Sequence, residues 1–467
     1  MSDSKAYLAA VEGGGTTFVV SVARILSKDD GGENSNDNTL NIGSTKLQLL
    51  HTATIPRRDE VTGEIPNNFT PEQIIQDSCS FFRRHLPPDG YSALGIATFG
   101  PAGLDPSSKH QYGKILEGSP KKLWRGVDIL SPIREACGLV GGKLEERVAF
   151  DTDVNAPAMA EFRHRCYLQQ QQQQQESGNS SAKPLTSLSY ITIGTGVGVG
   201  LVLNSLPLHG LLHPEGGHIA IQPLPNDKFT GYSWGAKSPY KGLGTVEGMT
   251  SSVALTERWI QMEKEGEMVK KLYRKNGEEQ PQHSDTEANN TSDSNGDNAQ
   301  TREVLSTLPD THPIWLHASN AIANLCVSLL LLTSCQKIVL GGGIMKREIL
   351  YPMVRSRVWT LLNGYLDSVD ELSEEKKLED VIVGSSWEEV GSGLVGAFAL
   401  ALDAYEKDGD DDDEEEVTAF DSEADEKKKA TAEREQHSFT SGVLAGIGLS
   451  FGCALMMSLL GRVSPRR

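Results

Sequence analysis

The sequence has 467 residues and a formal net charge of −19, a length that allows two domains with separate hydrophobic cores. Thirteen acidic residues and one lysine lie between Glu406 and Glu426, so the rest of the chain is only mildly acidic. We expect no nucleic-acid partner, because such partners require clustered Lys and Arg side chains that displace counterions. The scattered cysteines have no paired C-x-x-C spacing, and Met1–Ser4 begins no secretory signal, which predicts reduced thiols in a cytosol-facing protein.

The first part of the chain alternates strand-like and helical patterns. Residues 7–23 are two apolar, β-branched runs around a glycine turn, which is typical of a tight hairpin, and the polar stretch 28–41 is expected to be a long surface loop. Residues 71–85 have proline in a first turn and apolar residues at helical spacing, and a buried strand is predicted over 93–99. This is the order of a helix that leads into a strand.

A short strand over 148–150 is predicted to lead into the next helix. Asp151 or Thr152 is expected to cap this helix, which continues to about Cys166.

The second half of the chain follows the plan of the first. Residues 189–203 repeat the strand, glycine turn and strand, and a helix over 317–332 leads to a strand over 337–340, three glycines and a helix from about Met345. Two such units, each of which begins a lobe and presents glycine amides to one cleft, predict a duplicated α/β ATPase. The predicted lobes are residues 5–150, completed by about 386–404, and residues 151–385.

Three polar segments are predicted to be disordered insertions on this scaffold. They are Gln169–Gln175 with the Ser/Gly stretch that follows, the run 276–301, and the acidic segment, which is read as a linker over 406–438. Each has too few apolar residues to offset the entropy of ordering it. Passive surface loops are the favoured interpretation, and phosphorylation or partner docking is the alternative.

The apolar run 442–460 contains no charged residue and approaches the ~20 residues that cross a bilayer. It predicts a C-terminal transmembrane helix over about 440–461, a tail anchor that holds a cytosol-facing enzyme on an organelle membrane such as a mitochondrial or plastid outer membrane. The alternative is a buried core helix.

Three glycine clusters are candidate nucleotide-binding segments, because residues without side chains let backbone amides approach an anion. The first stands between two strands and is not a Walker A loop, since no Gly-Lys-Ser/Thr follows; a hairpin that binds nothing is the alternative. The second, Gly194–Gly200, continues as a strand instead of opening a helix, which fits a Rossmann site poorly. The third follows a strand and is expected to lie against adenosine. The residues assigned to the cofactor are Glu12, Gly13, Gly14, Gly15, Thr16, Thr17, Thr195, Gly196, Gly341, Gly342 and Gly343.

The order of these motifs resembles the ROK family of sugar kinases, in particular its bacterial fructokinase branch. The resemblance covers about residues 7–405 without the three insertions. Its motifs are Val11–Phe18, Phe99-Gly100-Pro101, Thr152-Asp153-Val154-Asn155-Ala156, Gly194–Gly200, His213-Pro214-Glu215-Gly216-Gly217-His218, Val339–Gly343 and Gly393–Ala397.

This resemblance implies a two-lobed actin-like (ribonuclease H-like) ATPase fold that uses ATP and Mg²⁺. It makes Asp153 the general base that deprotonates a sugar hydroxyl, although in isolation the residue reads as a helix cap. Sugar contacts are implied for Gly100, Asn155, Glu215, His218 and Glu247. Glu12 is expected near Mg²⁺ or an ordered water, and no residue of this chain is assigned as a metal ligand.

Two departures from the family pattern matter. Fructokinases of this branch bind a structural zinc through the histidine of the Glu-x-Gly-His motif and three cysteines, but residues 229–248 contain no cysteine, so zinc is expected to be absent. Because the same loop contributes to sugar recognition, this change leaves the sugar open. The second departure is Thr17, where the family typically has lysine, and loss of this charge is expected to weaken ATP binding.

The leading hypothesis is therefore ATP-dependent phosphorylation of D-fructose to fructose 6-phosphate. Mannose, glucose or an N-acetylhexosamine is the alternative substrate, and an inactive membrane-tethered sugar-binding regulator is the second alternative. A DNA-binding repressor is disfavoured, because the first strand begins at about Tyr7 and leaves no room for a helix-turn-helix. A homodimer is left open.

Overall fold

The computed structural model describes residues 5–14, 17–27, 38–56, 69–175, 183–235, 238–275, 304–387 and 390–414. The predicted transmembrane run, the polar segment 276–301, and Gly15 and Thr16 of the first glycine cluster lie outside the described residues. Residues up to Tyr405 form one compact unit, which contains two β-sheets.

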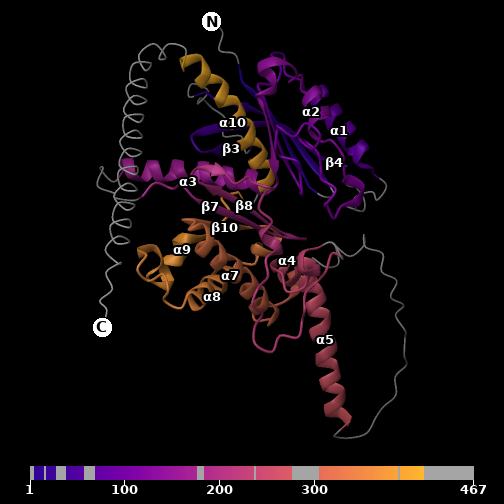
Figure 1. Cartoon of the computed structure of the whole chain (residues 1–467), viewed down its shortest axis with the longest axis vertical. Coiled ribbons are helices and arrows are strands. Elements are labelled where there is room, and N and C mark those ends of the chain that lie inside the picture. Colours follow the sequence, from indigo (N-terminus) through magenta and orange to yellow (C-terminus); the bar gives the residue numbers. More distant parts are fainter. Residues whose placement is uncertain are drawn as a thin grey trace, which may run out of the picture. The chain divides into compact units, whose positions relative to one another are not determined.

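The first sheet has six strands in the order β3-β4-β2-β1-β5-β6 (Figure 1). The hairpin of β1 and β2 is antiparallel, whereas β5 and β6 run parallel to β1 and to each other. The strands are β1 (Tyr7–Gly13), β2 (Phe18–Ile25), β3 (Thr39–Ile42), β4 (Thr45–Ile55), β5 (Ala93–Thr98) and β6 (Val148–Thr152).

The second sheet repeats this arrangement in the order β11-β10-β7-β8-β9. The β7 and β8 pair forms the antiparallel hairpin, and β10 and β11 extend the sheet in parallel from β7. The strands are β7 (Leu188–Ile193), β8 (Val197–Leu203), β9 (Leu206–Pro207), β10 (Lys337–Gly341) and β11 (Ile382–Gly384). The duplication predicted from the two strand–turn–strand units is therefore present in the topology.

The helices are α1 (Pro71–Arg84), α2 (Leu130–Ala136), α3 (Asn155–Gln175), α4 (Val246–Thr250), α5 (Ser252–Lys275), α7 (Ile314–Thr333), α8 (Leu350–Leu362), α9 (Leu378–Val381) and α10 (Ser392–Glu414). Helix α1 begins with Pro71 in its first turn, as its sequence predicts, and the Thr70 hydroxyl caps it by accepting a hydrogen bond from the Gln73 amide.

Alternating side chains of β1 enter cores on both faces of the first sheet. Ala9 and Val11 join the core with α1 and α2, whereas Leu8 and Ala10 join the core with α10. In the second sheet, α7 and α8 cover one face.

Helix α3 lies between the two sheets and belongs to a core on each side (Figure 1). Its first turn is in close contact with backbone on two sides, and glycine makes both contacts possible. A Cβ atom on Gly200 of β8 would lie 2.0 Å from the Val154 carbonyl oxygen, and one on Gly396 of α10 would lie 2.5 Å from the Pro157 nitrogen. The start of α3 is thus held from both lobes.

Several details of the sequence prediction were wrong. Strand β3 occupies the end of the predicted loop 28–41, because the apolar side chains of Leu40 and Ile42 are buried in a core of the first sheet. Helix α3 continues through Gln175, so the glutamine run is helical, since glutamine is a good helix former that extends an existing helix at little cost.

Two further predicted boundaries also differ. Helix α10 likewise continues to Glu414, into the segment predicted to be a disordered linker, because it extends a helix already anchored in the core. The residues around Met345 form a 3₁₀ turn, and α8 begins only at Leu350.

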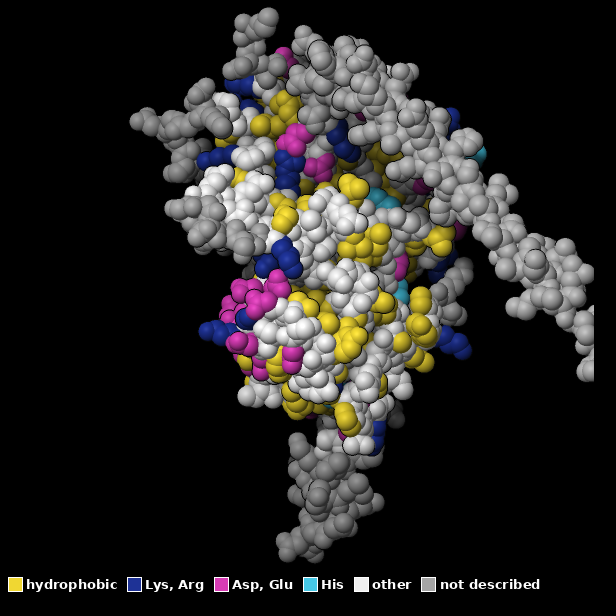
Figure 2. Space-filling view, turned by 60° about the vertical axis from the view of Figure 1, so that its left-hand side comes forward, with side chains coloured by type: hydrophobic (Ala, Val, Ile, Leu, Met, Phe, Trp, Pro, Cys, Tyr) yellow, Lys and Arg dark blue, Asp and Glu magenta, His cyan; other side chains and the backbone are white. Residues whose placement is uncertain are grey.

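One helix in the described part of the chain, α7, has the length and apolar composition of a membrane span, but 67% of its apolar window is buried inside the protein. It is a core helix of the second lobe. At the surface, Figure 2 shows acidic side chains gathered on one part of the molecule, and the exposed segment 370–380 around α9 is rich in Asp and Glu.

We expect Gly200→Ala to lower the free energy of unfolding by about 1–3 kcal/mol or more, because the added methyl meets the Val154 carbonyl and must push α3 from β8. Denaturant unfolding measures the loss. Gly210→Ala is the matched control, since a Cβ there meets nothing within 4 Å. Equal unfolding midpoints for the two variants would contradict the tight contact.

Candidate active site

A cleft of about 1110 Å³ opens between the two lobes, a size suited to a nucleotide. Two carboxylates line this cleft: Glu12 comes from β1 of the first lobe, and Asp153 directly precedes α3. Gly341, Gly342 and Gly343, which follow β10, line it as well, together with the connection from β11 to α10. The glycine cluster predicted to lie against adenosine and the predicted general base therefore share one cavity.

Asp153 is positioned by the junction of β6 and α3. Its backbone amide donates to the Thr98 carbonyl at 2.8 Å, which ties it to the end of β5. The cap of α3 comes from its neighbour, because the Thr152 hydroxyl accepts from the Asn155 amide at 3.0 Å. The Asp153 carboxylate is therefore not needed as the cap, and burial raises its pKa to about 6 despite the nearby Lys121.

Lys121 is a site residue that sequence reasoning missed. Its ammonium lies 4.1 Å from the centre of the Phe99 ring, and it is close enough to Asp153 to lower the pKa of that carboxyl. Burial lowers the pKa of Lys121 itself to about 8, with Asp153 opposing the shift. A single lysine in a loop carries no motif, so only the fold brings it to the base.

Glu12 ends β1 opposite the first turn of α10. The Leu394 amide donates to its carboxylate, and a Cβ on Gly393 would lie 2.3 Å from its Oε1 atom, so glycine is what lets the helix approach. Burial, reinforced by the charge of Asp153, raises the pKa of Glu12 to about 7. The negative charge of Asp153 thus makes Glu12 harder to ionise.

Glu215 lies between two histidines. Its Oε1 atom is 3.8 Å from His213 Nε2 and its Oε2 atom is 3.8 Å from His218 Nε2. The side chain is 41% exposed, which leaves it open to a ligand. Burial, and then the charges of Glu247 and Asp153, raise the pKa of Glu215 to about 7, which places it in the same electrostatic cluster as the base.

Glu247 belongs to α4 and closes the β7–β8 hairpin. Its Oε2 atom accepts from the Val197 amide at 2.9 Å, and Trp234 donates to the same carboxylate. A Cβ on Gly196 would lie 2.6 Å from Oε2, so this glycine makes room for Glu247. Burial raises the pKa of Glu247, and the nearby His218 lowers it in part.

Asn155 and Gly100 are placed behind the site. Asn155 is fully buried, and its amide accepts from the Leu201 amide and donates to the Leu208 carbonyl. A Cβ on Gly100 would lie 2.6 Å from His213 Nε2. Both residues therefore make contacts that position α3 and the His213 segment.

The first two glycine clusters contribute unequally to the cleft. Gly13 is a buried strand residue packed on Thr98, and Gly14 donates to the Thr17 carbonyl at 2.9 Å in the turn of the hairpin. Gly194 and Thr195 line the cleft. Gly200, by contrast, serves packing against α3, as described above.

The segment after His218, where the family's cysteines are missing, is held to α5 and α7 by a buried ion pair and a histidine contact. Asp227 accepts from Arg258 at 2.8 Å and lies 3.0 Å from His317 Nδ1, and both Arg258 and Asp227 are almost fully buried. Arg258 also lies over the Phe229 ring at 4.4 Å. Among the described residues, no group of three or more His, Cys, Asp or Glu side chains could hold a metal ion.

The family model of the ROK family matches residues 39–404, which is most of the chain. The chain belongs to the ROK family. A fructokinase from Zymomonas mobilis is 29% identical over 341 residues, 72% of this chain and 87% of the relative, and a fructokinase from Streptococcus mutans is 27% identical over 85% of this chain and 98% of the relative.

A solved structure of similar fold is the ROK hexokinase from Thermus thermophilus, with a TM-score of 0.50 and 19% identity over 86% of this chain and 99% of that chain. This ROK chain therefore has the actin-like α/β ATPase fold, as the resemblance implied.

We expect kcat/KM to follow a bell-shaped pH profile, because Asp153 with a pKa of about 6 must be ionised and Lys121 with a pKa of about 8 must stay protonated. In Lys121→Met, the cation that holds the Asp153 pKa down is lost, so the acidic limb moves to higher pH by about one unit or more. Lys122→Met, on the exposed next residue, is the control. An acidic limb that does not move in Lys121→Met would show that the two groups are not coupled.

Proposed function

We propose that this chain, a sugar kinase of the ROK family, transfers the γ-phosphate of ATP to a hydroxyl of D-fructose and forms fructose 6-phosphate, with Asp153 as the general base. The observation that carries the proposal is the position of Asp153. It lies in the nucleotide-sized cleft, and its negative charge contributes to the raised pKa of Glu215, which lies between two histidines.

Asp153 has the protonation state that this chemistry needs. With a pKa of about 6 it is ionised at neutral pH, yet it is a much stronger base than an exposed aspartate. Lys121, beside it, would stabilise the negative charge that develops as the sugar oxygen attacks. Mg²⁺, when bound with ATP, neutralises charge on the phosphates, and the oxygens of Glu12 would hold it or one of its waters.

The sugar would lie on the side of Asp153 that Glu215 and Glu247 occupy. A carboxyl whose pKa is raised to about 7, such as that of Glu215, both donates and accepts hydrogen bonds near neutral pH. His218, 3.8 Å from Glu215, adds a second group of either kind. Such groups recognise the alternating hydroxyls of a hexose.

Fructose is favoured over other hexoses because both sequence relatives reported above are named fructokinases, and because the Thr-Asp-Val-Asn and His-Pro-Glu-Gly-Gly-His motifs of this chain resemble the fructokinase branch. Mannose, glucose and N-acetylhexosamines are the alternatives, because residues 229–248, a loop that takes part in sugar recognition in the family, lack the family's cysteines. We also propose that the chain binds no structural zinc, which metal analysis of the purified protein tests.

The decisive measurement is a coupled assay of ATP turnover on fructose, mannose, glucose and N-acetylhexosamines. We expect fructose to have the highest kcat/KM, and Asp153→Asn to lower kcat about 10²–10⁴-fold with ATP binding retained. Ionised Asp153 opposes folding above pH 6, since its pKa in the fold lies above the ordinary 3.8, so the variant should be at least as stable as wild type there. A folded wild type that turns over no hexose would favour the sugar-binding regulator.

We further propose that the apolar run 442–460 attaches the enzyme to an organelle membrane and leaves the active site in the cytosol. Its support is the length of the run and its lack of charge. A fluorescent fusion of the full chain should localise to a membrane, and one without residues 440–461 should be diffuse. Diffuse fluorescence from both fusions would refute the anchor.

A further inference from the structure

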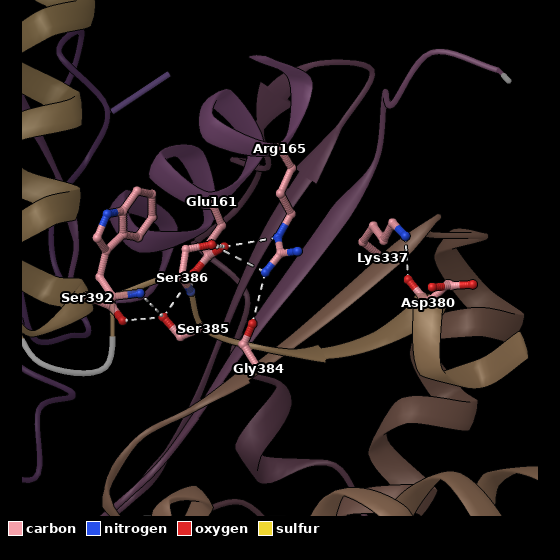
Figure 3. Close-up of polar contacts among 9 residues, drawn as sticks. Glu161, Arg165, Lys337, Asp380, Gly384, Ser385, Ser386 and Ser392 are labelled. Atoms are coloured by element: carbon pink, nitrogen blue, oxygen red, sulfur yellow. Dashed lines mark hydrogen bonds and ion pairs between the residues drawn. The ribbon is translucent and has the colours of Figure 1, made fainter. Parts of the chain in front are cut away.

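Glu161 of α3 is a fully buried carboxylate that the reaction described above does not use (Figure 3). Its Oε1 atom accepts from the Ser385 hydroxyl at 2.9 Å and from the Ser386 amide at 2.6 Å. Its Oε2 atom accepts from the Ser386 hydroxyl at 2.8 Å and from Arg165 at 3.0 Å. Each oxygen therefore has two donors, which is what a buried charge requires.

These contacts join the helix that begins beside the general base to the connection between β11 and α10. Arg165 adds a bond to the Gly384 carbonyl at 2.9 Å, so the connection is held at consecutive residues. Ser385 and Ser392 of this connection line the nucleotide-sized cleft. Glu161 is thus one contact removed from the cleft.

The carboxylate also dictates how the hydroxyl hydrogens point. A carboxylate only accepts, so the single hydrogen of Ser385 is committed to Glu161. Ser385 and Ser392 are 2.8 Å apart, and the hydrogen between them must then come from Ser392. The Ser385 oxygen also accepts from the Trp387 amide at 3.3 Å, which completes its capacity.

The direction of these two bonds decides what the cleft meets. The hydrogens of Ser385 and Ser392 both point toward Glu161, so Ser392, which lines the cleft, presents oxygen lone pairs to it.

We propose that Glu161 is a positioning residue for the nucleotide: through Ser385 and Ser392 it sets the cleft floor as a hydrogen-bond acceptor, which binds a hydrogen-bond donor of the bound nucleotide complex. Ribose hydroxyls, the adenine amino group and waters on the nucleotide's metal ion are the donors of this kind, whereas phosphate oxygens are not. The inference rests on the proposed use of ATP and adds a determinant of its binding.

The test measures affinity for MgADP by calorimetry and KM for ATP and for sugar in Glu161→Gln and Ser385→Ala. The NH₂ group of the new glutamine must point its hydrogens at another donor, either the Ser386 amide or Arg165. It also no longer fixes the direction of the Ser385 and Ser392 hydroxyl hydrogens. Ser385→Ala removes the hydroxyl that links Glu161 to Ser392 but leaves Glu161 three hydrogen-bond donors. This variant therefore replaces Glu161→Gln in the test if Glu161→Gln fails to fold. We expect about tenfold weaker nucleotide binding in each, with KM for sugar within about twofold.

Asp403→Asn is the matched control, because it breaks the 2.8 Å ion pair of Arg163 with Asp403, another contact between α3 and α10. It should leave nucleotide affinity unchanged. Unchanged nucleotide affinity in folded Glu161→Gln and Ser385→Ala, an equal loss of sugar affinity, or an equal effect of Asp403→Asn would each overturn the proposal.

Two further arms identify the donor. If it is a ribose hydroxyl, 2′- or 3′-deoxy-ATP binds wild type weakly and loses nothing more in Ser385→Ala. If it is a metal-bound water, all these nucleotides weaken alike in Ser385→Ala, and metal-free ADP does not. If it is the adenine amino group, metal-free ADP weakens as well. Calorimetry needs no turnover: a wild type that binds MgADP but phosphorylates no hexose overturns the proposed function alone, and one that binds no nucleotide overturns both.

Discussion

The first turn of α3 is packed between a strand of one sheet and a helix that packs on the other, and the position of Asp153 depends on this packing. Gly200 and Gly396 bring backbone of β8 and α10 within contact of Val154 and Pro157, where any larger residue would collide. Because protein interiors are close-packed, such contacts leave little freedom to the residue that precedes them. Asp153 is therefore held at the lobe junction by packing, and its own side chain is left for chemistry.

Electrostatics then distinguishes the groups that packing brings together. Glu12, Asp153 and Glu215 all have raised pKa values because burial disfavours the charged form of each, and the charge of Asp153 adds to the shifts of Glu12 and Glu215. The pKa of Asp153 is the lowest of the three, and Lys121 is the cation that opposes its shift. Lys121 thus helps to keep Asp153 ionised at neutral pH beside carboxyls that titrate there.

Helix α3 also fastens the connection between β11 and α10. Glu161 and Arg165 bind Gly384, Ser385 and Ser386 (Figure 3), and Glu12 receives the Leu394 amide from the first turn of α10. Part of the cleft lining and Asp153 are consequently tied to the same two helices. A displacement of α10 relative to α3 would therefore disturb both.

Hydrophobic periodicity and glycine turns are local properties, so the sequence by itself determined both hairpins and helix α1. The motif order, which resembles the ROK family, pointed to Asp153, Glu215 and Glu247. Only the tertiary structure decided which glycines serve packing and that Lys121 lies beside Asp153. It also buried Asn155 among backbone groups. These features arise from contacts between residues far apart in the chain, whose burial and charge no local pattern records.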